Sequence, residues 1–290
     1  MDIDMLKAFQ TAAFAGTISK AAQQLGYAQS NITTKIRQLE NDLGTPLFYR
    51  HNRGITLTSA GKTLLEYAGQ VLRLVEEARK AVTDGTTPTG SLSIGSMETT
   101  AAVRLPELLA AYHRSYPEVN LSLVTGPTEQ LVQAVLDYEL DGAFVAGPVE
   151  HPDLLQESFI EEELMVVTQS THPPLSSAKE LNTRTVLAFR AGCSYRAKME
   201  QWLHEEGVMP VKILEFGTLE TILGCVAAGL GVSLLPRSIV QRKAEKNFIR
   251  CHPIPDKHGY VWTVLIRRKD AYVSRAYTAF TDEISAKFVR

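Results

Sequence analysis

The sequence predicts an α/β protein with a small helical N-terminal part, one long helix and a larger part in which strands and helices alternate. Apolar residues recur at helical spacing over residues 5–39, and a seam spaced alternately by four and three follows over residues 59–83. Beyond residue 90, short β-rich runs alternate with helical patterns. The chain has 290 residues, 44% of them apolar and 21% charged. This composition is typical of a globular protein of two domains with room for a third small module.

The apolar spacing near the N-terminus predicts three short helices before Gly44. The apolar positions are Leu6, Phe9 and Ala13, then Ile18, Ala21 or Ala22, and Leu25, then Ile32, Ile36 and Leu39. Thr17 is suited to cap the second helix, because its hydroxyl oxygen can accept from a free backbone N–H of the first turn. Gly26 is suited to end the same helix in a left-handed conformation.

A turn-forming group and a long helical seam follow these helices. Two short extended pieces flank His51-Asn52-Arg53-Gly54, which predicts a small hairpin or wing. The seam of the following helix consists of Leu64, Ala68, Val71, Val75, Ala78 and Val82. Such alternation holds one helix face against a partner helix, as in a coiled coil. Residues 84–90 are turn formers and small polar residues, which predicts a linker.

The rest of the chain predicts an α/β domain with mostly parallel strands. The strand candidates are Leu92–Gly95, Val119–Val124, Gly142–Ala146, Leu164–Thr168, Thr185–Phe189, Val211–Phe216, Val232–Leu235 and Trp262–Ile266. The helical candidates are Ala101–Tyr116, Thr128–Tyr138, Tyr195–Glu206, Leu219–Ala228 and Ser274–Phe288. The acidic run Glu161-Glu162-Glu163 is expected to be a solvated crossing between two parts of this domain.

Charge, apolar runs and cysteines exclude several classes of protein. The formal net charge is −2, so any contact with a nucleic acid must be local. The longest apolar runs are far shorter than the roughly 20 residues of a membrane helix, and the acidic N-terminus is unlike a secretory signal. We therefore expect a cytoplasmic protein with no membrane partner. Cys193, Cys225 and Cys251 have no CxxC spacing and the seven histidines are scattered, so we expect reduced thiols, no metal site and no cofactor.

The polar face of the third helix is the first candidate site. If Ile32, Ile36 and Leu39 face a core, then Gln29, Ser30, Thr33, Thr34 and Arg37 lie on the opposite face. An exposed helix of this width fits the major groove of B-DNA, where Gln, Ser, Thr and Arg pair with base edges. Two helices joined by a glycine turn and offering such residues at the start of the second are typical of a helix-turn-helix. A merely solvated helix face is the alternative, and the nearby basic residues favour DNA.

The segment from Phe9 to Gly61 resembles the winged helix-turn-helix of LysR-type transcriptional regulators. The residues that carry the resemblance are GTISKAAQQLGYAQSNITTKIRQLENDLGTPLFYRHNRGITLTSAG, and the family pattern is AAxxLxxxQSxxTxxIxxLExxLGxxLFxRxxRxxxLTxAG. Nearly every fixed position matches. One departure is Ala28, where the family often has Ser or Thr as the helix N-cap, so capping would pass to Gln29 or Ser30.

The resemblance implies a division of the whole chain. It places a winged helix-turn-helix DNA-binding domain at residues 1–58, a dimerisation helix at 59–83, a hinge at 84–90 and an effector-binding domain at 91–290. The last would be two-lobed, similar to periplasmic solute-binding proteins, with lobe I at about 91–161 and 267–290 and lobe II at about 162–266. The segment GLGVSLLP, from Gly229 to Pro236, resembles the second lobe of that family.

The resemblance also implies a function and a set of partners. We expect a sequence-specific DNA-binding transcriptional regulator, not an enzyme, whose activity a small-molecule effector modulates. Its partners would be double-stranded promoter DNA, a second copy in a homodimer or homotetramer, and RNA polymerase. The expected DNA-binding residues are Gln29, Ser30, Asn31, Thr33, Thr34, Lys35, Arg37, Arg50, His51 and Arg53. Target promoter, effector identity and the choice between activation and repression are not determined by the sequence.

The candidate effector site combines strand ends, small hydroxyl residues and helix starts. In two-lobed α/β domains, ligands lie at the carboxyl ends of strands, where free helix N–H groups favour anions. The expected effector-binding residues are Ser96, Thr99, Thr100, Thr125, Gly126, Thr128, Cys193, Ser194, Arg196 and Thr218. The expected ligand is a small anion or carboxylate, with Arg190 and Arg196 as candidate partners, of which one is expected to be a surface residue. Simple helix capping by Ser or Thr is the alternative.

Three further alternatives concern chemistry. A thiol near a helix N-terminus can have a lowered pKa, so Cys193 raises the possibility of a redox-responsive regulator. Tyr195 and Lys198 lie on one helix face, but a solvated helix explains them better than a proton relay. Gly229-Leu230-Gly231 does not complete a dinucleotide-binding GxGxxG. A solute-binding or enzymatic α/β protein whose N-terminal helices serve only assembly is the rival from another class.

Overall fold

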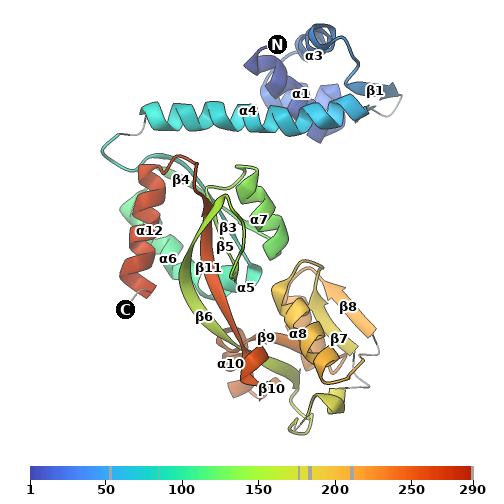
Figure 1. Ribbon diagram of the computed structural model, residues 1–290, viewed down its shortest axis with the longest axis vertical. Helices are drawn as coiled ribbons and strands as arrows, with labels where there is room; N and C mark the ends of the chain where they lie inside the picture. The colour runs from blue at the N-terminus through green and yellow to red at the C-terminus, as the bar shows by residue number, and fades with distance from the viewer. Residues whose placement is uncertain (52–53, 84, 176, 182–184, 210–211, 289–290) are drawn as a thin grey trace. The chain divides into compact units, whose positions relative to one another are not determined.

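Helical apolar spacing in the first part of the chain produces the three helices that the sequence predicts. The computed structural model (Figure 1) describes residues 1–51, 54–83, 85–175, 177–181, 185–209 and 212–288. Its contacts divide the chain into two units, Met1–Thr83 and Asp84–Arg290. The first unit begins with α1 (Ile3–Ala15), α2 (Ile18–Leu25) and α3 (Gln29–Leu43).

Capping in the first unit follows the predictions at two positions and differs at a third. The side chain of Thr17 accepts from the backbone N–H of Lys20, and Gly26 ends α2 with a φ of 68°. Both predictions are confirmed. At the start of α3, however, Ala28 is the N-cap and no side chain caps the helix. The expectation that Gln29 or Ser30 would do so is wrong, because both residues already lie in the first turn of α3.

A hairpin and a long helix complete the first unit. β1 (Phe48–His51) pairs antiparallel with β2 (Gly54–Leu57), with Phe48 opposite Leu57, so the predicted hairpin is confirmed. The residues of its tip, Asn52 and Arg53, lie outside the described ones. α4 spans Ser59–Thr83 as predicted. The core between these elements contains Phe9, Ile32, Ile36 and Leu39, all fully buried.

The second unit is built on one mixed sheet and one small parallel sheet. The strands of the larger sheet are β3 (Gly90–Ser96), β4 (Val119–Thr125), β5 (Gly142–Gly147), β6 (Leu154–Gln169), β9 (Ser233–Pro236), β10 (Ile249–Pro253) and β11 (Tyr260–Arg268). Their order is β10-β6-β11-β5-β3-β4, and β9 also pairs with β6. β7 (Thr185–Phe189) and β8 (Lys212–Phe216) form the second sheet.

The expectation of mostly parallel strands is wrong for the middle of the larger sheet. β3 pairs in parallel with β4 and β5, and β7 does so with β8, but β6 and β11 pair antiparallel with every neighbour. β11 lies between β5 and β6 and pairs antiparallel with both, so these two strands run parallel to each other without being hydrogen-bonded neighbours. The antiparallel pairs arise because β11, from late in the chain, is inserted between two earlier strands.

Helices surround the sheets in two groups. The helices are α5 (Glu98–Val103), α6 (Leu105–Ser115), α7 (Thr128–Leu136), α8 (Ser194–Glu205), α9 (Leu219–Ala227), α10 (Arg237–Glu245), α11 (Asp256–Gly259) and α12 (Arg275–Phe288), with a 3-10 turn at Ala178–Leu181. The helix expected over 101–116 is two helices, because Pro106 has no backbone N–H to donate and is tolerated only in a first turn. Neither α10 nor β10 was expected.

The helices and outer strands gather at the two ends of β6 and β11 (Figure 1). We call β3–β5 with α5–α7 and α12 the first lobe, and β7–β10 with α8–α10 the second lobe. The lobe boundaries expected from the sequence fall inside β6 and β11, and they stay a prediction. Among the described residues, no helix is both long and apolar enough to cross a bilayer.

The acidic run lies in β6, which runs between the two lobes as expected, but its middle glutamate is buried and not solvated. Glu162 is 6% exposed, and its carboxylate accepts from Arg104 Nε at 2.8 Å and from Ser238 Oγ at 2.8 Å. A buried carboxylate is tolerated when it is paired and hydrogen-bonded in this way. Because Arg104 belongs to the first lobe and Ser238 to the second, Glu162 holds the two lobes together. The sequence-based expectation for Glu162 is therefore wrong.

Candidate functional site

The outer face of α3 carries the polar residues expected to contact DNA. Ile32, Ile36 and Leu39 are fully buried. The side chains of Gln29, Ser30, Asn31, Thr34 and Arg37 are exposed, and Thr33 and Lys35 are half-buried. The helical arrangement derived from the apolar spacing is therefore present.

Hydrogen bonds order the start of this face. The Ser19 hydroxyl on α2 donates to Gln29 Oε1 at 3.0 Å, which fixes the Gln29 amide at the first position of α3. The hydroxyls of Thr33 and Thr34 donate to the carbonyls of Gln29 and Ser30, at 2.9 Å each. Such bonds to the preceding turn hold hydroxyl side chains close to the helix. Gln29 is thus a positioned donor and acceptor at the helix start.

The basic residues near α3 differ in their pairing. Lys35 Nζ lies 3.4 Å from Asp4, and an Arg50 nitrogen lies 3.2 Å from Glu40. Glu40 also accepts from the backbone N–H of Leu47, so Arg50 is tied to the base of the hairpin. His51 is exposed at the end of β1. Arg53 lies outside the described residues.

The seam of α4 divides into two stretches. Leu64 and Ala68 pack against the core of the first unit, so the chain itself uses the start of the predicted seam. Val71, Val75 and Val82 are exposed by 39%, 37% and 87%. This second stretch is an apolar helix face with room for a partner.

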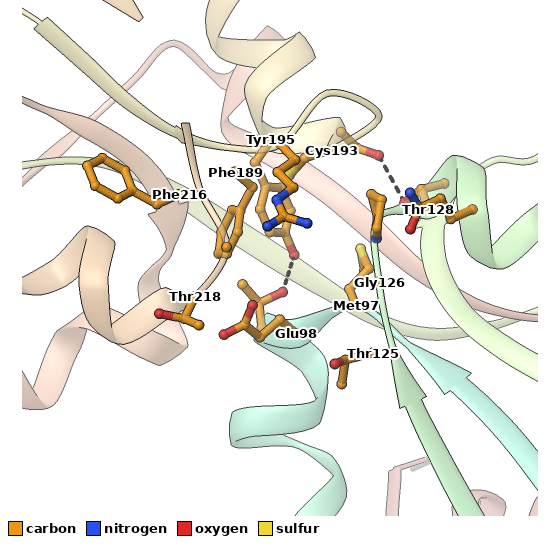
Figure 2. Close-up of a pocket in the computed structure, with 16 residues that line it drawn as sticks. Met97, Glu98, Thr125, Gly126, Thr128, Phe189, Cys193, Tyr195, Phe216 and Thr218 are labelled. Atoms are coloured by element: carbon orange, nitrogen blue, oxygen red, sulfur yellow. Dashed lines mark hydrogen bonds between the residues drawn. The ribbon is translucent and has the colours of Figure 1, made fainter. Parts of the chain in front are cut away.

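A cavity of about 350 Å³ lies between the two lobes of the second unit. Figure 2 shows its side chains, which come from strand ends and helix starts of both lobes. Its lining residues are Met97, Glu98, Thr99, Thr125, Gly126, Pro127, Thr128, Gln130, Phe189, Arg190, Cys193, Ser194, Tyr195, Phe216, Gly217 and Thr218. Its volume is typical of a small-molecule site.

Three hydrogen bonds join the lobes at this cavity. Ser194 donates to Thr128 Oγ1 at 3.2 Å, and the hydroxyls of Thr99 and Tyr195 are 3.1 Å apart (Figure 2). Glu98 Oε1 accepts from the backbone N–H of Leu219 at 2.8 Å. Burial raises the pKa of Tyr195, so its phenol stays protonated and can donate across the lobes. A change in the cavity is therefore coupled to the contact between the lobes.

The helices that begin at the cavity differ in whether side chains accept hydrogen bonds from the backbone N–H groups of their first turns. Thr218 caps α9 through the N–H of Thr221, and Glu98 accepts from its first N–H. The N-caps of α7 and α8 are Pro127 and Cys193, and neither makes a side-chain capping bond. Free N–H groups and the helix dipole favour an anion at such ends.

The two candidate arginines have different environments. Arg196 is ion-paired to Glu200 and Glu215, which raise the pKa of its guanidinium, and it does not line the cavity. Arg190 lines the cavity and is exposed, and its guanidinium makes no hydrogen bond or ion pair with any described residue. Of the two, Arg190 is the exposed residue and the side chain of Arg196 is 19% exposed, so the expectation that one is a surface residue and not a ligand partner stays a prediction. The free cation at the cavity is Arg190.

The structure brings together seven of the ten residues expected at the effector site. Thr99, Thr125, Gly126, Thr128, Cys193, Ser194 and Thr218 line the cavity. Ser96 is fully buried and donates to the carbonyl of Met97, and Thr100 is 4% exposed inside α5. Sequence reasoning missed the apolar lining, Met97, Phe189 and Phe216, because apolar strand ends look like core. It also missed Glu98 and Gln130, whose surroundings depend on the second lobe.

The cysteine in the cavity has an environment opposite to that of a reactive thiol. Burial raises the pKa of the Cys193 thiol, and the nearby backbone N–H groups and Arg196 only partly offset this effect. A raised pKa lowers the thiolate fraction, and the thiolate is the reactive form. The redox alternative gains no support from this site. The described residues also contain no cluster of three or more metal-binding side chains.

Two family models match the chain. "Bacterial regulatory helix-turn-helix protein, lysR family" matches residues 3–62, and "LysR substrate binding domain" matches residues 85–288. The two matches correspond to the two units of the structure.

Relatives match over almost the whole length. The chain is 56% identical over 288 residues to the HTH-type transcriptional regulator GltR of Bacillus subtilis, covering 99% of this chain and 97% of the relative. It is 46% identical over 284 residues to the HTH-type transcriptional regulator CzcR of Bacillus thuringiensis, covering 98% and 97%. A solved full-length OxyR variant from Pseudomonas aeruginosa is similar with a TM-score of 0.73 and 25% identity, covering 98% of this chain and 95% of that chain.

Proposed function

This chain belongs to the LysR family of bacterial helix-turn-helix regulators, and we propose that the regulator responds to a small carboxylate bound in the cavity between its lobes. Family membership makes it a DNA-binding transcriptional regulator with an effector-binding domain, not an enzyme. The rival reading, a solute-binding protein without DNA function, is excluded by the same matches.

The main support for an anionic effector is the environment of Arg190. Its guanidinium is the cation in the cavity without a partner among the described residues. Planar guanidinium groups match carboxylates with two parallel hydrogen bonds. The uncapped starts of α7 and α8 supply further donors at the same cavity, and so does the Thr128 hydroxyl, which accepts from Ser194 and keeps its own hydrogen. An anionic ligand would satisfy all of these groups.

Replacing Arg190 by glutamine tests this proposal directly. In thermal-shift and calorimetric titrations of the full chain with small carboxylates and amino acids, a true effector should raise the melting temperature, because it binds only the folded state. Arg190→Gln should weaken its binding by roughly 10- to 150-fold, the worth of a hydrogen bond to a charged group. The matched control is Arg196→Gln, six residues away and already ion-paired. Equal binding by Arg190→Gln and the parent protein would contradict the proposal.

For DNA, we propose that the start of α3 reads bases and the surrounding cations contact phosphates. Gln29, ordered by Ser19, offers the donor and acceptor pair that matches adenine in the major groove. Ser30, Asn31, Thr33, Thr34 and Arg37 extend this face, and Lys35, Arg50, His51 and Arg53 lie beside it in the chain. The family model over residues 3–62 supports this proposal.

Replacing Gln29 by alanine should reduce specific binding and relax base preference. The expected cost is about 1–3 kcal/mol at the specific site, with much less change on random DNA, because only the specific complex uses base contacts. Fluorescence anisotropy with operator and scrambled duplexes measures both affinities. Asn41→Ala, an exposed substitution in the last turn of α3, is the control. Equal losses on both duplexes would mean that Gln29 does not read a base.

The assembly is proposed from α4. Its exposed apolar stretch at Val71, Val75 and Val82 is the face on which a second chain would pack. A dimer would present two α3 helices to successive major grooves, about 34–36 Å apart. Effector binding would act by changing the contact between the lobes, and with it the packing of dimers into tetramers. A contact with RNA polymerase stays a prediction.

A further inference from the structure

The cavity between the lobes carries two opposite charges that do not neutralise each other. Arg190 and Glu98 both line it, and among the described residues they form no ion pair with one another. The other lining residues are uncharged in their ordinary states or polar without charge. A ligand that fills this cavity therefore meets one cation and one anion.

Glu98 is held in place by the opposite lobe. It starts α5 in the first lobe, is half-buried, and its Oε1 accepts from the N–H of Leu219 in the second lobe at 2.8 Å. Its other oxygen, Oε2, has no hydrogen-bond partner among the described residues. One oxygen thus anchors the carboxylate, and the other is available to a ligand donor.

Both charges approach the same short turn after β8. An Arg190 nitrogen would lie 3.6 Å from a Cβ added at Gly217, and Glu98 contacts the backbone of Leu219. Two residues of chain span at most about 7 Å. The two charged groups therefore face the same end of the cavity, and a small ligand can reach both.

From this arrangement we propose that the effector is an α-amino acid whose carboxylate binds Arg190 and whose ammonium group binds Glu98. The inference rests on the proposed function and names the ligand class of the same site. A zwitterion pairs with both charges, whereas the second anion of a dicarboxylate would meet Glu98 at a like-charge cost. An ammonium group also supplies three donors for the free carboxylate oxygen.

The apolar residues of the cavity lining indicate which kind of side chain the amino-acid ligand has. Phe189 and Phe216 are direct neighbours in the register of β7 and β8, and Figure 2 shows both rings on the same side of the site as Glu98 and Thr218. Met97 adds a third apolar side chain to the lining. An apolar or aromatic amino acid buries its side chain here without leaving a charge unpaired.

The test compares ligands that differ in one charge, on the full chain. The twenty common amino acids, succinate and glutarate are first screened by thermal shift. Isothermal titration then compares L-phenylalanine with hydrocinnamate, which lacks the amine, and with L-phenylalaninamide, which lacks the acid; L-leucine, isocaproate and L-leucinamide form a second set. The amino acid should bind about tenfold more tightly than either analogue, because each analogue leaves one charged group without its hydrogen bond.

The Glu98→Gln variant tests the role of the anion. It keeps an oxygen for the Leu219 N–H but loses the charge, so amino-acid binding should fall by about tenfold and hydrocinnamate or isocaproate binding should stay equal or improve. Glu220→Gln, an exposed carboxylate in the first turn of α9, should change neither. The analogue series on the parent protein gives an answer even if Glu98→Gln is poorly folded.

The outcomes separate this inference from the proposed function. Succinate or glutarate binding that depends on Arg190 but is indifferent to Glu98→Gln would overturn the amino-acid assignment and keep the carboxylate proposal. The same holds if amino acids bind no better than their monocarboxylate analogues. If no amino acid and no dicarboxylate stabilises the chain, both proposals fail.

Discussion

Replacing Val75 by lysine is expected to separate the regulator into monomers and to lower its operator affinity by roughly 10²- to 10⁴-fold, the usual gain from linking two binding modules. Val75 lies in the exposed apolar stretch of α4, between Val71 and Val82. An ammonium group at the centre of a helix pair would have to be desolvated there without a partner. The loss would occur although lysine adds positive charge, which by itself favours DNA.

Sedimentation velocity and anisotropy with one-half-site and two-half-site duplexes measure this effect. The monomer should bind both duplexes with similar affinity, whereas the parent protein should prefer two half-sites. Glu76→Lys is the control, because residue 76 is rotated by about 100° from residue 75 and leaves the apolar stretch. A dimeric Val75→Lys protein with unchanged affinity would show that another surface assembles the chain.

Replacing Ile36 by alanine is expected to unfold the first unit selectively. Ile36 is fully buried on the inner face of α3, among Phe9, Ile32 and Leu39. Removing a buried isoleucine side chain down to Cβ costs about 2–5 kcal/mol through lost burial and the cavity left behind. A module of this size has little stability in reserve. DNA binding should therefore be lost at temperatures where the effector-binding unit is still folded.

The positions of the tryptophans make this selectivity measurable. Trp202 and Trp262 are the only tryptophans of the sequence, and both belong to the second unit. Tryptophan fluorescence should report the same melting transition in Ile36→Ala and the parent protein, whereas far-UV circular dichroism should report an earlier loss of helix. Asn41→Ala, on the exposed face of the same helix, should leave both signals unchanged. A downward shift of the fluorescence transition would mean that the two units unfold together.

How much of each unit could be predicted depended on how far apart in the sequence its interacting residues lie. In the first unit, helices, caps and the limits of α4 follow from spacings and residue types within a few positions, as at Thr17 and Gly26. In the second unit, β6 pairs with strands from far along the chain. Only its last part, Leu164–Thr168, was predicted as a strand. The acidic part before it was not, because the partners that make Glu162 tolerable inside, Arg104 and Ser238, are distant in sequence.

The candidate effector site also depends partly on local sequence and partly on residues that are distant along the chain. Hydroxyl residues between a strand and a helix were recognisable locally, and seven of the ten expected residues line one cavity. Which of the two arginines faces the cavity without a partner could not be predicted from the residues near it in the sequence. Arg196 is neutralised by Glu215 on β8, while Arg190 stays free at the cavity. Ser96 and Thr100 share the local pattern but point into the protein interior.

By itself, the sequence determined the helical first unit, the bounds of the long helix α4 and the family to which the chain belongs, because these depend on residues close together along the chain. Tertiary structure alone decided which charges meet in the cavity. It tied Glu98 to the N–H of Leu219, left Arg190 without a partner among the described residues and buried Glu162 between the lobes. The physical reason is that the interaction energy of a charged group depends on how deeply it is buried and on the distance and sign of the charges around it. In this cavity those neighbouring groups come from opposite lobes.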